Sequence, residues 1–301
     1  MTKQAVKESA RVLLSALVDY AGLFPPAQLS MSKAVSNYAA YKTGDYSWML
    51  GRFILPVSRL DEFTESARGI FPNDKTDLWR LSVLADEDIQ ETVRKTKDFN
   101  RGFSSKAVCD TLEIKANDSL QIEEIIEFVP PEFTNYFELP LTKNLEDSVA
   151  TLALKNGRAK IRTGGVTANA FPSAAQIMSF MQTCIAAKVP LKATAGLHHP
   201  LRCTKPLTYE RDAPTGAMHG FLNVFLAAGF LQQGYKPSLI EELLEDESAE
   251  NFLFDDNGVL WREEYFLSTE QLKNLRERGA VSFGSCSFEE PIQDLQETRI
   301  L

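Results

Sequence analysis

The sequence is short of the residues that most often build metal sites and disulfides. It has three histidines and four cysteines in 301 residues, no two cysteines lie at C-x-x-C spacing, and no H-E-x-x-H pattern occurs. Without a cysteine framework, the thiols are expected to stay reduced, as is usual in the cytosol. The sequence also has no apolar run of the ~18 residues that a membrane span needs, and no signal-peptide pattern at its start. These absences predict a cytoplasmic protein.

Positive charge is also in short supply. Asp and Glu outnumber Lys and Arg by 41 to 32, which gives a formal net charge of −9. Such a protein has no overall attraction for nucleic acid or for an anionic membrane. Hydrophobic residues make up 44% of the chain and charged residues 24%, which is typical of globular proteins. We therefore expect neither nucleic acid nor membrane as a partner, while a local basic pocket for a small anion is compatible with this charge.

Short apolar segments alternate with amphipathic helical segments along most of the chain. This alternation predicts strands that pair in parallel through right-handed helical crossovers. An eighth strand is predicted between residues 251 and 263, where Asn257-Gly258 also indicates a turn, and residues 9–22 are predicted to be a helix. The seven clearer strands are predicted at residues 52–60, 78–86, 107–118, 135–141, 158–165, 189–200 and 280–288.

Eight such strands predict an α/β fold, a closed (β/α)8 TIM barrel, formed by residues 1–301 as a single domain. This fold typically needs ~250 residues, so the chain is long enough. The less regular region 200–280 is predicted to carry an additional helical and hairpin insertion before the last strand. An open doubly wound sheet is the alternative. It ordinarily has a glycine-rich phosphate loop after its first strand, and residues 53–60 contain no glycine.

Basic side chains gather at the ends of two consecutive predicted strands. In a TIM barrel the reacting groups lie at the C-terminal ends of strands, where every second side chain points inward. Lys160 and Arg162 alternate on one strand, and Lys192 and Thr194 on the next. This register predicts two lysines and an arginine in one small space, whereas a register shifted by one would leave Lys160 exposed at the other end. Like charges and burial both lower a lysine pKa, as a Schiff-base nucleophile requires.

Carboxylates and glycines complete the candidate site. Glu113 alternates with Lys115 on one predicted strand, and Glu138 lies on the next. Either glutamate could transfer protons or simply pair with the cations in a structural ion network. Gly284-Ser285 could hold a phosphate near a helix N-terminus or could be an ordinary part of the last strand. The other substrate-binding candidates, mostly small residues that let a ligand approach the backbone, are Thr163, Gly164, Gly165, Thr194 and Gly196.

All three histidines lie between residues 198 and 219. His198 and His199 follow a predicted strand, and Cys203 and His219 come next. These residues could bind substrate, act as acid or base, support the fold, or form a metal site. Adjacent histidines on an extended segment point in opposite directions, so both rarely ligate one metal. We therefore expect no metal, and we take His198 and His199 as candidate substrate-binding residues.

Five segments in order along the chain share a pattern with one family of enzymes. They are VDYAGLFPPA (18–27), FILPVS (53–58), KIRTG (160–164), KATAGL (192–197) and FGSCS (283–287). Together they resemble the deoxyribose-phosphate aldolase family of class I aldolases, in the same order and at roughly the same spacing. KIRTG is similar to the strand that carries the Schiff-base lysine in that family, and KATAGL to the segment with the second active-site lysine.

The resemblance implies a TIM barrel that uses neither a metal nor an organic cofactor. It implies that Lys160 forms a carbinolamine and then a Schiff base, and that Lys192 lowers the pKa of Lys160. The family's acidic group has no clear counterpart, and Glu113 is our candidate. Arg162 replaces a small residue beside the nucleophile, and residues 197–200 replace a segment that helps to hold phosphate. The resemblance therefore implies the lysine chemistry but not the family's substrate.

We therefore expect an enzyme, a Schiff-base aldolase or lyase that acts on a small anionic carbonyl compound. Lys160 is the expected nucleophile, Glu113 or Glu138 moves protons, and Arg162 binds the anionic group in bidentate fashion. One alternative is a non-catalytic barrel that binds a phosphorylated or carboxylated metabolite. Another is a metal-dependent hydrolase or lyase centred on the three histidines and Cys203. A homo-oligomer is a further expectation.

Overall fold

Eight parallel strands close into a barrel in the computed structural model, which describes residues 5–72, 78–141 and 143–301. The order around the barrel follows the chain, and the last strand closes it by pairing with the first. This arrangement confirms the predicted (β/α)8 TIM barrel. The barrel strands are β1 (Val18–Tyr20), β2 (Leu50–Pro56), β3 (Trp79–Leu84), β4 (Ala107–Lys115), β5 (Thr134–Glu138), β6 (Arg158–Arg162), β7 (Leu191–Thr194) and β13 (Ala280–Ser285).

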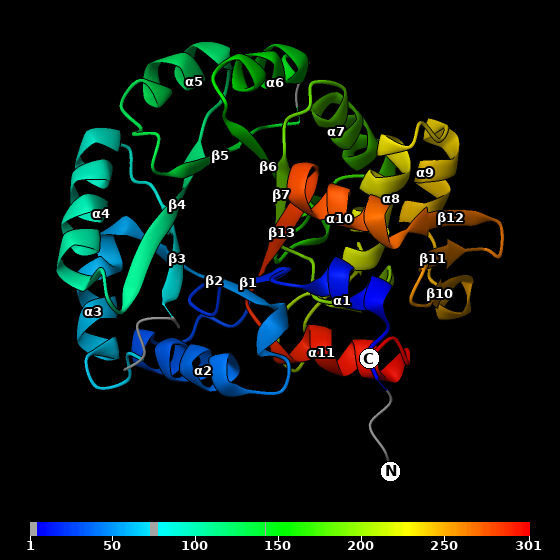
Figure 1. The fold of residues 1–301 in the computed structure, drawn as a ribbon, viewed down its shortest axis with the longest axis horizontal. Helices are drawn as coiled ribbons and strands as arrows, with labels where there is room; N and C mark the ends of the chain where they lie inside the picture. The colour runs from blue at the N-terminus through cyan, green and yellow to red at the C-terminus, as the bar shows by residue number, and fades with distance from the viewer. Residues whose placement is uncertain (1–4, 73–77, 142) are drawn as a thin grey trace.

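Helices cover the outside of the barrel, as Figure 1 shows. Several begin at a residue whose side chain accepts a hydrogen bond from the first turn, among them Asp88, Asp118 and Ser173. Asp and Ser are among the residues most often found at such positions. The outer helices are α1 (Glu8–Leu14), α2 (Met31–Thr43), α3 (Leu60–Ala67), α4 (Ile89–Phe103), α5 (Ser119–Ile126), α6 (Leu145–Leu154), α7 (Ala174–Ala186), α8 (Phe221–Gln232), α10 (Thr269–Arg278) and α11 (Glu289–Glu297).

The first barrel strand lies in a segment that was predicted to be helical. The predicted helix 9–22 is wrong in its second half, because α1 ends at Leu14 and β1 begins at Val18. Ala16 has a φ of 47°, a left-handed conformation through which a right-handed helix cannot continue. All three residues of β1 are buried. A short strand buried on both faces shows no polar alternation in its sequence, so nothing in the pattern marked it.

The predicted eighth strand between residues 251 and 263 is wrong as a barrel strand. These residues contribute β10 (Phe252–Phe254) and β11 (Gly258–Trp261) to a separate antiparallel sheet with β12 (Tyr265–Ser268). The turn indicated by Asn257-Gly258 is confirmed, since the Asp255 carboxylate accepts hydrogen bonds from both of their backbone N–H groups. The sheet lies between β7 and β13 in the chain, where an insertion was predicted.

The rest of this insertion consists of a hairpin and two helices. The strands β8 (Cys203–Pro206) and β9 (Thr215–Met218) pair in antiparallel fashion, and α8 and α9 (Pro237–Leu244) follow. Residues 221–230 of α8 are all buried, because the helix is apolar on every side. It therefore belongs to the core. Among the helices of the described residues, none has the length and apolar character needed to cross a membrane.

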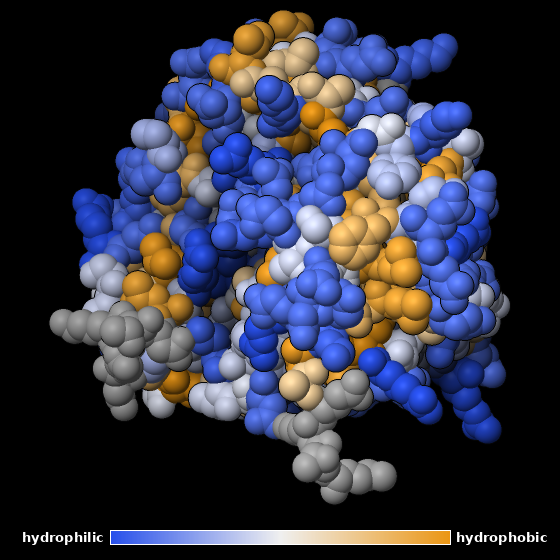
Figure 2. All heavy atoms as spheres, turned by 45° about the vertical axis from the view of Figure 1, so that its right-hand side comes forward, coloured by the Kyte–Doolittle hydropathy of each residue, from blue (hydrophilic) through white to orange (hydrophobic). Residues whose placement is uncertain are grey.

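Some large apolar side chains are exposed on the surface. On the face shown in Figure 2, hydrophobic residues appear in separate patches among hydrophilic ones. Leu253 of β10 and Phe266 of β12 are exposed and lie in register across β11. Exposed apolar side chains also occur on ordinary monomers and do not by themselves indicate an interface. The homo-oligomer stays a prediction.

Candidate active site

Five charged side chains meet inside the barrel. The strand register pairs Lys160 with both Glu138 and Lys192. The Nζ atom of Lys160 lies 2.7 Å from Oε2 of Glu113 and 2.8 Å from Oε2 of Glu138. The Nζ atom of Lys192 lies 2.5 Å from Oε1 of Glu113 and 2.6 Å from Oδ2 of Asp19. Glu113 therefore bridges the two lysines, and we call these five residues the lysine–carboxylate cluster.

Carboxylates relieve the repulsion that was expected between the two lysines. Burial by itself lowers the pKa of Lys192, but Asp19 and Glu113 outweigh burial and hold this pKa above its usual range. Burial by itself raises the pKa of Glu113, but Lys160 and Lys192 hold it well below its usual range. The repulsion expected between the two lysines therefore does not lower the pKa of Lys192, because the carboxylate of Glu113 lies between the two ammonium groups.

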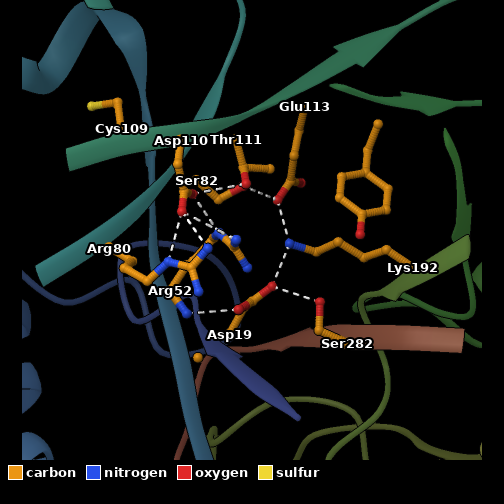
Figure 3. A network of polar contacts seen from close by, with 12 residues as sticks. Asp19, Arg52, Arg80, Ser82, Cys109, Asp110, Thr111, Glu113, Lys192 and Ser282 are labelled. Carbon is orange, nitrogen blue, oxygen red and sulfur yellow. Dashed lines mark hydrogen bonds and ion pairs between the residues drawn. The ribbon is translucent and has the colours of Figure 1, made fainter. Parts of the chain in front are cut away.

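Further hydrogen bonds hold the carboxylates of Glu113 and Asp19 in place. The hydroxyl of Ser82 donates to Oε1 of Glu113, and the hydroxyl of Ser282 donates to Oδ2 of Asp19. Figure 3 shows the ammonium group of Lys192 pointing between these two carboxylates. The backbone N–H of Arg52 donates to Oδ1 of Asp19 at 2.7 Å. Because their partners come from different strands, the carboxylates are held in place before any ligand binds.

Arginines extend this network to the far side of the barrel interior. The Nε atoms of Arg52 and Arg80 each donate to the carboxylate of Asp110 at 2.6 Å. Burial by itself raises the pKa of Asp110, but its hydrogen bond with Arg52 helps to hold that pKa below its usual range. Figure 3 shows these side chains beside the Asp19 end of the cluster. The interior of this barrel is therefore filled in part by paired charges.

The cluster forms one wall of a cavity of about 320 Å³. Lys160, Glu113 and Glu138 border the cavity, whereas Lys192, which is 1% exposed, lies behind Glu113. Lys160 is 4% exposed, so only the end of its side chain can reach a ligand. The opposite walls are largely apolar and include Phe24, Pro25, Pro26, Ile54, Leu84 and Val166. A cavity of this kind suits a small molecule with one polar reacting group.

Arg162 lies at the border between this cavity and a second one. Its side chain is 55% exposed, and Nη1 lies 4.0 Å from Oε1 of Glu138. A neighbouring cavity of about 530 Å³ shares Lys115, Glu138 and Arg162 with the first. The predicted register of Lys160 and Arg162 is confirmed, since both side chains line the same cavity. Two cations, Lys115 and Arg162, therefore stand where the two cavities meet.

The predicted small residues fall into two groups. Gly165, Thr194, Gly196 and Gly284 line the first cavity, and Gly164 lines the second. Gly196 has a φ of +74°, and a Cβ atom there would lie 2.8 Å from the Cα atom of Gly164, so glycine is required. Thr163 is fully buried, and its hydroxyl donates to the carbonyl of Ala195 at 2.7 Å. Thr163 therefore holds the loop after β7 and is placed away from the ligand.

The last strand leads to a helix N-terminus that already carries negative charge. Gly284 borders the cavity, but Ser285 is buried and its hydroxyl accepts a hydrogen bond from the backbone of Ser287. The first turn of α11 contains Glu289 and Glu290. These carboxylates already complement the positive end of the helix dipole, and they would repel a phosphate placed there. The position predicted to hold a phosphate is therefore electrostatically unfavourable for an anion.

The three histidines have three different sets of partners. His198 lines the cavity, and its Nδ1 atom lies 3.3 Å from Oε2 of Glu290. Nδ1 of His199 lies 2.5 Å from Oδ2 of Asp294, and Nε2 of His219 bonds the carbonyl of Pro172. In the parts of the chain that the structure describes, no three His, Cys, Asp or Glu side chains are grouped so as to hold a metal ion. This geometry gives the metal-dependent alternative no support.

Sequence reasoning missed Asp19, Ser82 and Ser282. Asp19 lies within the segment that was predicted to be helical, so its inward direction was not foreseen. The resemblance of residues 18–27 to the opening segment of the aldolase family was the one available signal, but it assigned no role to Asp19. Ser82 and Ser282 are ordinary residues of apolar strands, and only the three-dimensional register shows that they touch Glu113 and Asp19.

A scan against models of protein families gives no match to this chain, and a search of curated proteins gives no match either. The resemblance to the deoxyribose-phosphate aldolase family therefore rests on the five short segments quoted above. A barrel of this type carries many unrelated activities. The function has to be argued from the cluster, the cavity and their chemistry.

Proposed function

We propose that this protein is a Schiff-base lyase of the class I aldolase type that acts on a small anionic carbonyl compound. The observation that carries this proposal is the position of Lys160. It is a buried lysine whose Nζ atom reaches a ligand-sized cavity and touches two carboxylates, Glu113 and Glu138, at 2.7 and 2.8 Å. A nucleophilic amine with proton acceptors in direct contact is the arrangement that imine chemistry requires.

The first chemical step needs a neutral amine. The ammonium group of Lys160 would pass one proton to Glu138, which is within hydrogen-bond distance. The nitrogen lone pair then attacks the carbonyl carbon, and the electrons of the C=O π bond move to oxygen, which takes up a proton. The product is a carbinolamine. Glu138 is the better placed acid and base, because it borders both cavities and Glu113 is also committed to Lys192.

The second step turns the carbinolamine into an electron sink. Its hydroxyl leaves as water after protonation by the same carboxyl group, and a C=N⁺ iminium with Lys160 forms. The iminium accepts the electron pair of a neighbouring C–C bond while the hydroxyl proton of the departing fragment passes to the carboxylate, so an enamine forms and the fragment leaves as an aldehyde. The enamine then takes up that proton at carbon, and water hydrolyses the resulting iminium, which releases the second carbonyl product and the free amine of Lys160. In the synthetic direction the same steps run in reverse. Each proton transfer can use a carboxylate that touches Nζ of Lys160.

Lys192 serves a different purpose in this scheme. Its pKa is held above the usual range, and its ammonium group is enclosed by Asp19 and Glu113. It is therefore a fixed positive charge that keeps Glu113 ionised and in position. This role differs from a direct lowering of the pKa of Lys160 by repulsion, since Glu113 stands between the two lysines.

The anionic character of the substrate is supported by the charges around the cavity. Arg162 and Lys115 stand at the border of the two cavities. A guanidinium group binds a carboxylate or phosphate in bidentate fashion. We therefore place the anionic group of the substrate beside Arg162. The non-catalytic alternative uses the same cations but forms no covalent bond at Lys160.

The test is reduction with borohydride in the presence of a panel of small aldehydes and ketones, followed by intact-protein and peptide mass analysis. We expect one adduct per chain on Lys160, because borohydride reduces the iminium to a stable secondary amine. A folded protein that gives no adduct at Lys160 with any member of the panel, but whose melting temperature rises with carboxylate or phosphate ligands, would favour the binding protein instead.

Replacing Arg162 by methionine should weaken the response to anionic carbonyl compounds selectively. We expect the concentration for half-maximal trapping to rise about tenfold for a carboxylated aldehyde, because a charge-assisted hydrogen bond is lost. A neutral aldehyde of similar size should be trapped as before. Arg94→Met, a change on the exposed face of α4, is the matched control. An equal loss for charged and neutral compounds would contradict the assigned role of Arg162.

A further inference from the structure

A second group of reactive side chains lies on the wall of the same cavity. Cys286 follows β13 and His198 follows β7, and both line the cavity. The Sγ atom of Cys286 lies 4.0 Å from Nδ1 of His198, and the same Nδ1 lies 3.3 Å from Oε2 of Glu290. Tyr209, in the loop between β8 and β9, donates to Glu290 at 3.0 Å and lies 3.8 Å from Sγ. We call Cys286, His198, Glu290 and Tyr209 the thiol–imidazole cluster.

The partners of the His198 imidazole favour its charged form. Burial by itself lowers the pKa of His198, but its hydrogen bonds with Cys286 and Glu290 outweigh burial and raise the pKa to about 9. The Nδ1–H group is therefore directed between a carboxylate oxygen and a sulfur atom. A protonated imidazole beside a cysteine stabilises the developing negative charge when the thiol reacts. Nucleophile, imidazole and orienting carboxylate are all present.

The other three cysteines lack this combination of access and charge. Cys109 and Cys184 are buried in the core, and burial raises the pKa of both thiols. Cys203 is more exposed than Cys286, but burial still raises its pKa to about 11. Cys286 is only 5% exposed, yet that surface faces a cavity large enough for a small reagent. The expected reactivity of Cys286 therefore comes from its access to the cavity and from His198, and its exposed fraction alone would not predict it.

We propose that Cys286 is a modification site, a thiol that small disulfides convert into a mixed disulfide inside the cavity. The sulfur of Cys286 attacks one sulfur of the disulfide, a new S–S bond forms, and the old S–S bond breaks. The Cys286 sulfur is oxidised, and the leaving sulfur is reduced and departs as a thiol that carries the proton lost by Cys286. His198 is a positioning residue, which stabilises the sulfur while its charge develops.

The adduct would occupy the space that a substrate of Lys160 needs. Cys286 and Lys160 line one cavity of about 320 Å³, so a mixed disulfide at Cys286 places the added thiol group in the same space as the Nζ atom of Lys160. Modification of Cys286 is therefore expected to block the cavity reversibly. The thiol chemistry itself does not depend on the proposed function, and only this blocking consequence rests on it.

The reaction with bis(2-hydroxyethyl) disulfide, followed by peptide mass analysis over time, tests the proposal. We expect Cys286 to be labelled first, at least about tenfold faster than Cys203 at pH 7. His198→Gln should slow labelling of Cys286 about tenfold, with recovery only at alkaline pH. Glu290→Gln, at a partly exposed position, should slow it as well and keeps the test available if His198→Gln fails to fold. Glu91→Gln, which removes an exposed carboxylate on α4, is the control and should leave the rate unchanged.

Other titratable groups face this cluster and enter the pH profile. Tyr20 of β1 interacts electrostatically with Glu289 of α11 and with Cys286. His199 acts on Glu290. The decisive comparison is therefore between the wild type and His198→Gln across the whole pH range. Labelling of Cys203 before Cys286, or identical profiles for the wild type, His198→Gln and Glu290→Gln, would overturn the proposal.

Trapping of the labelled protein with cyanoborohydride, which reduces an iminium but leaves a disulfide intact, separates this inference from the proposed function. If the unmodified protein traps a carbonyl compound at Lys160, the Cys286 adduct should abolish trapping and reduction of the disulfide should restore it. Undiminished trapping in the adduct would refute the blocking consequence. If neither form traps any compound, the Schiff-base function fails, while the labelling rates still decide whether Cys286 is the reactive thiol.

Discussion

Replacing Glu113 by glutamine is expected to lower the free energy of unfolding by about 3–5 kcal/mol, the usual cost of breaking a buried ion pair from one side. Glu113 contacts both Lys160 and Lys192, and all three side chains are buried. Without its charge, two ammonium groups face each other in a medium that screens them poorly. Denaturant unfolding at pH 7 measures the loss. Glu91→Gln, which removes an exposed carboxylate on α4, is the control and should change little.

The same substitution should change how stability depends on pH. The pKa of Glu113 is lowered from an ordinary value of 4.5 by its two lysines, after they overcome the effect of burial. A lowered pKa means that this carboxylate stabilises the fold above about pH 4.5 and that the contribution is lost as the pH falls toward the folded-state pKa. Glu113→Gln should therefore show a weaker loss of stability in acid than the wild type. Equal pH slopes, or a loss no larger than that of Glu91→Gln, would contradict the bridging role.

The barrel could be predicted because most of its strands are recognisable apolar segments and most of them are followed by a helical segment. The errors fell at β1 and at residues 251–263, for related reasons. β1 has three residues, all buried, so it offers neither length nor alternation to recognise. Residues 251–263 do form strands, but they pair with β12 and not with the barrel. Local pattern predicts that a segment is extended, whereas its partner strand is decided by tertiary packing.

The part of the candidate site that follows from strand alternation could be predicted from the sequence. Alternation placed Lys160 and Arg162 on one face, and neighbouring strands then brought Lys160 and Lys192 together. The charge balance could not be predicted in this way, because it depends on Asp19 from the far end of the chain. Its carboxylate and that of Glu113 turn two cations that were expected to repel each other into a paired network. A pKa depends on neighbours in space, and the sequence gives only neighbours along the chain.

Lys160→Met is expected to lose adduct formation and keep its fold, whereas Lys192→Met is expected to lose stability and keep adduct formation. Lys160→Met should give no borohydride adduct with any carbonyl compound, because the only amine of the cluster that borders the cavity is gone. It should remain folded, since Glu113 keeps Lys192 as a partner and Glu138 borders a cavity where water or a proton can satisfy it. Lys160→Arg keeps the positive charge but not the amine nucleophile, so it should be more stable than Lys160→Met and equally unable to form the adduct.

Lys192→Met should instead be destabilised by about 3–5 kcal/mol, because Asp19 loses its ammonium partner in a fully buried position. The fraction of Lys192→Met that folds should still form an adduct at Lys160. The reaction should be slower, because Glu113 has lost its contact with the ammonium group of Lys192. Intact-protein mass after reduction, together with unfolding curves, measures both properties in each variant. Lys155→Met, at an exposed position on the helical side of the barrel, is the control. An adduct that survives in Lys160→Met and disappears in a folded Lys192→Met would assign the nucleophile to Lys192 and would reverse the roles proposed for the two lysines.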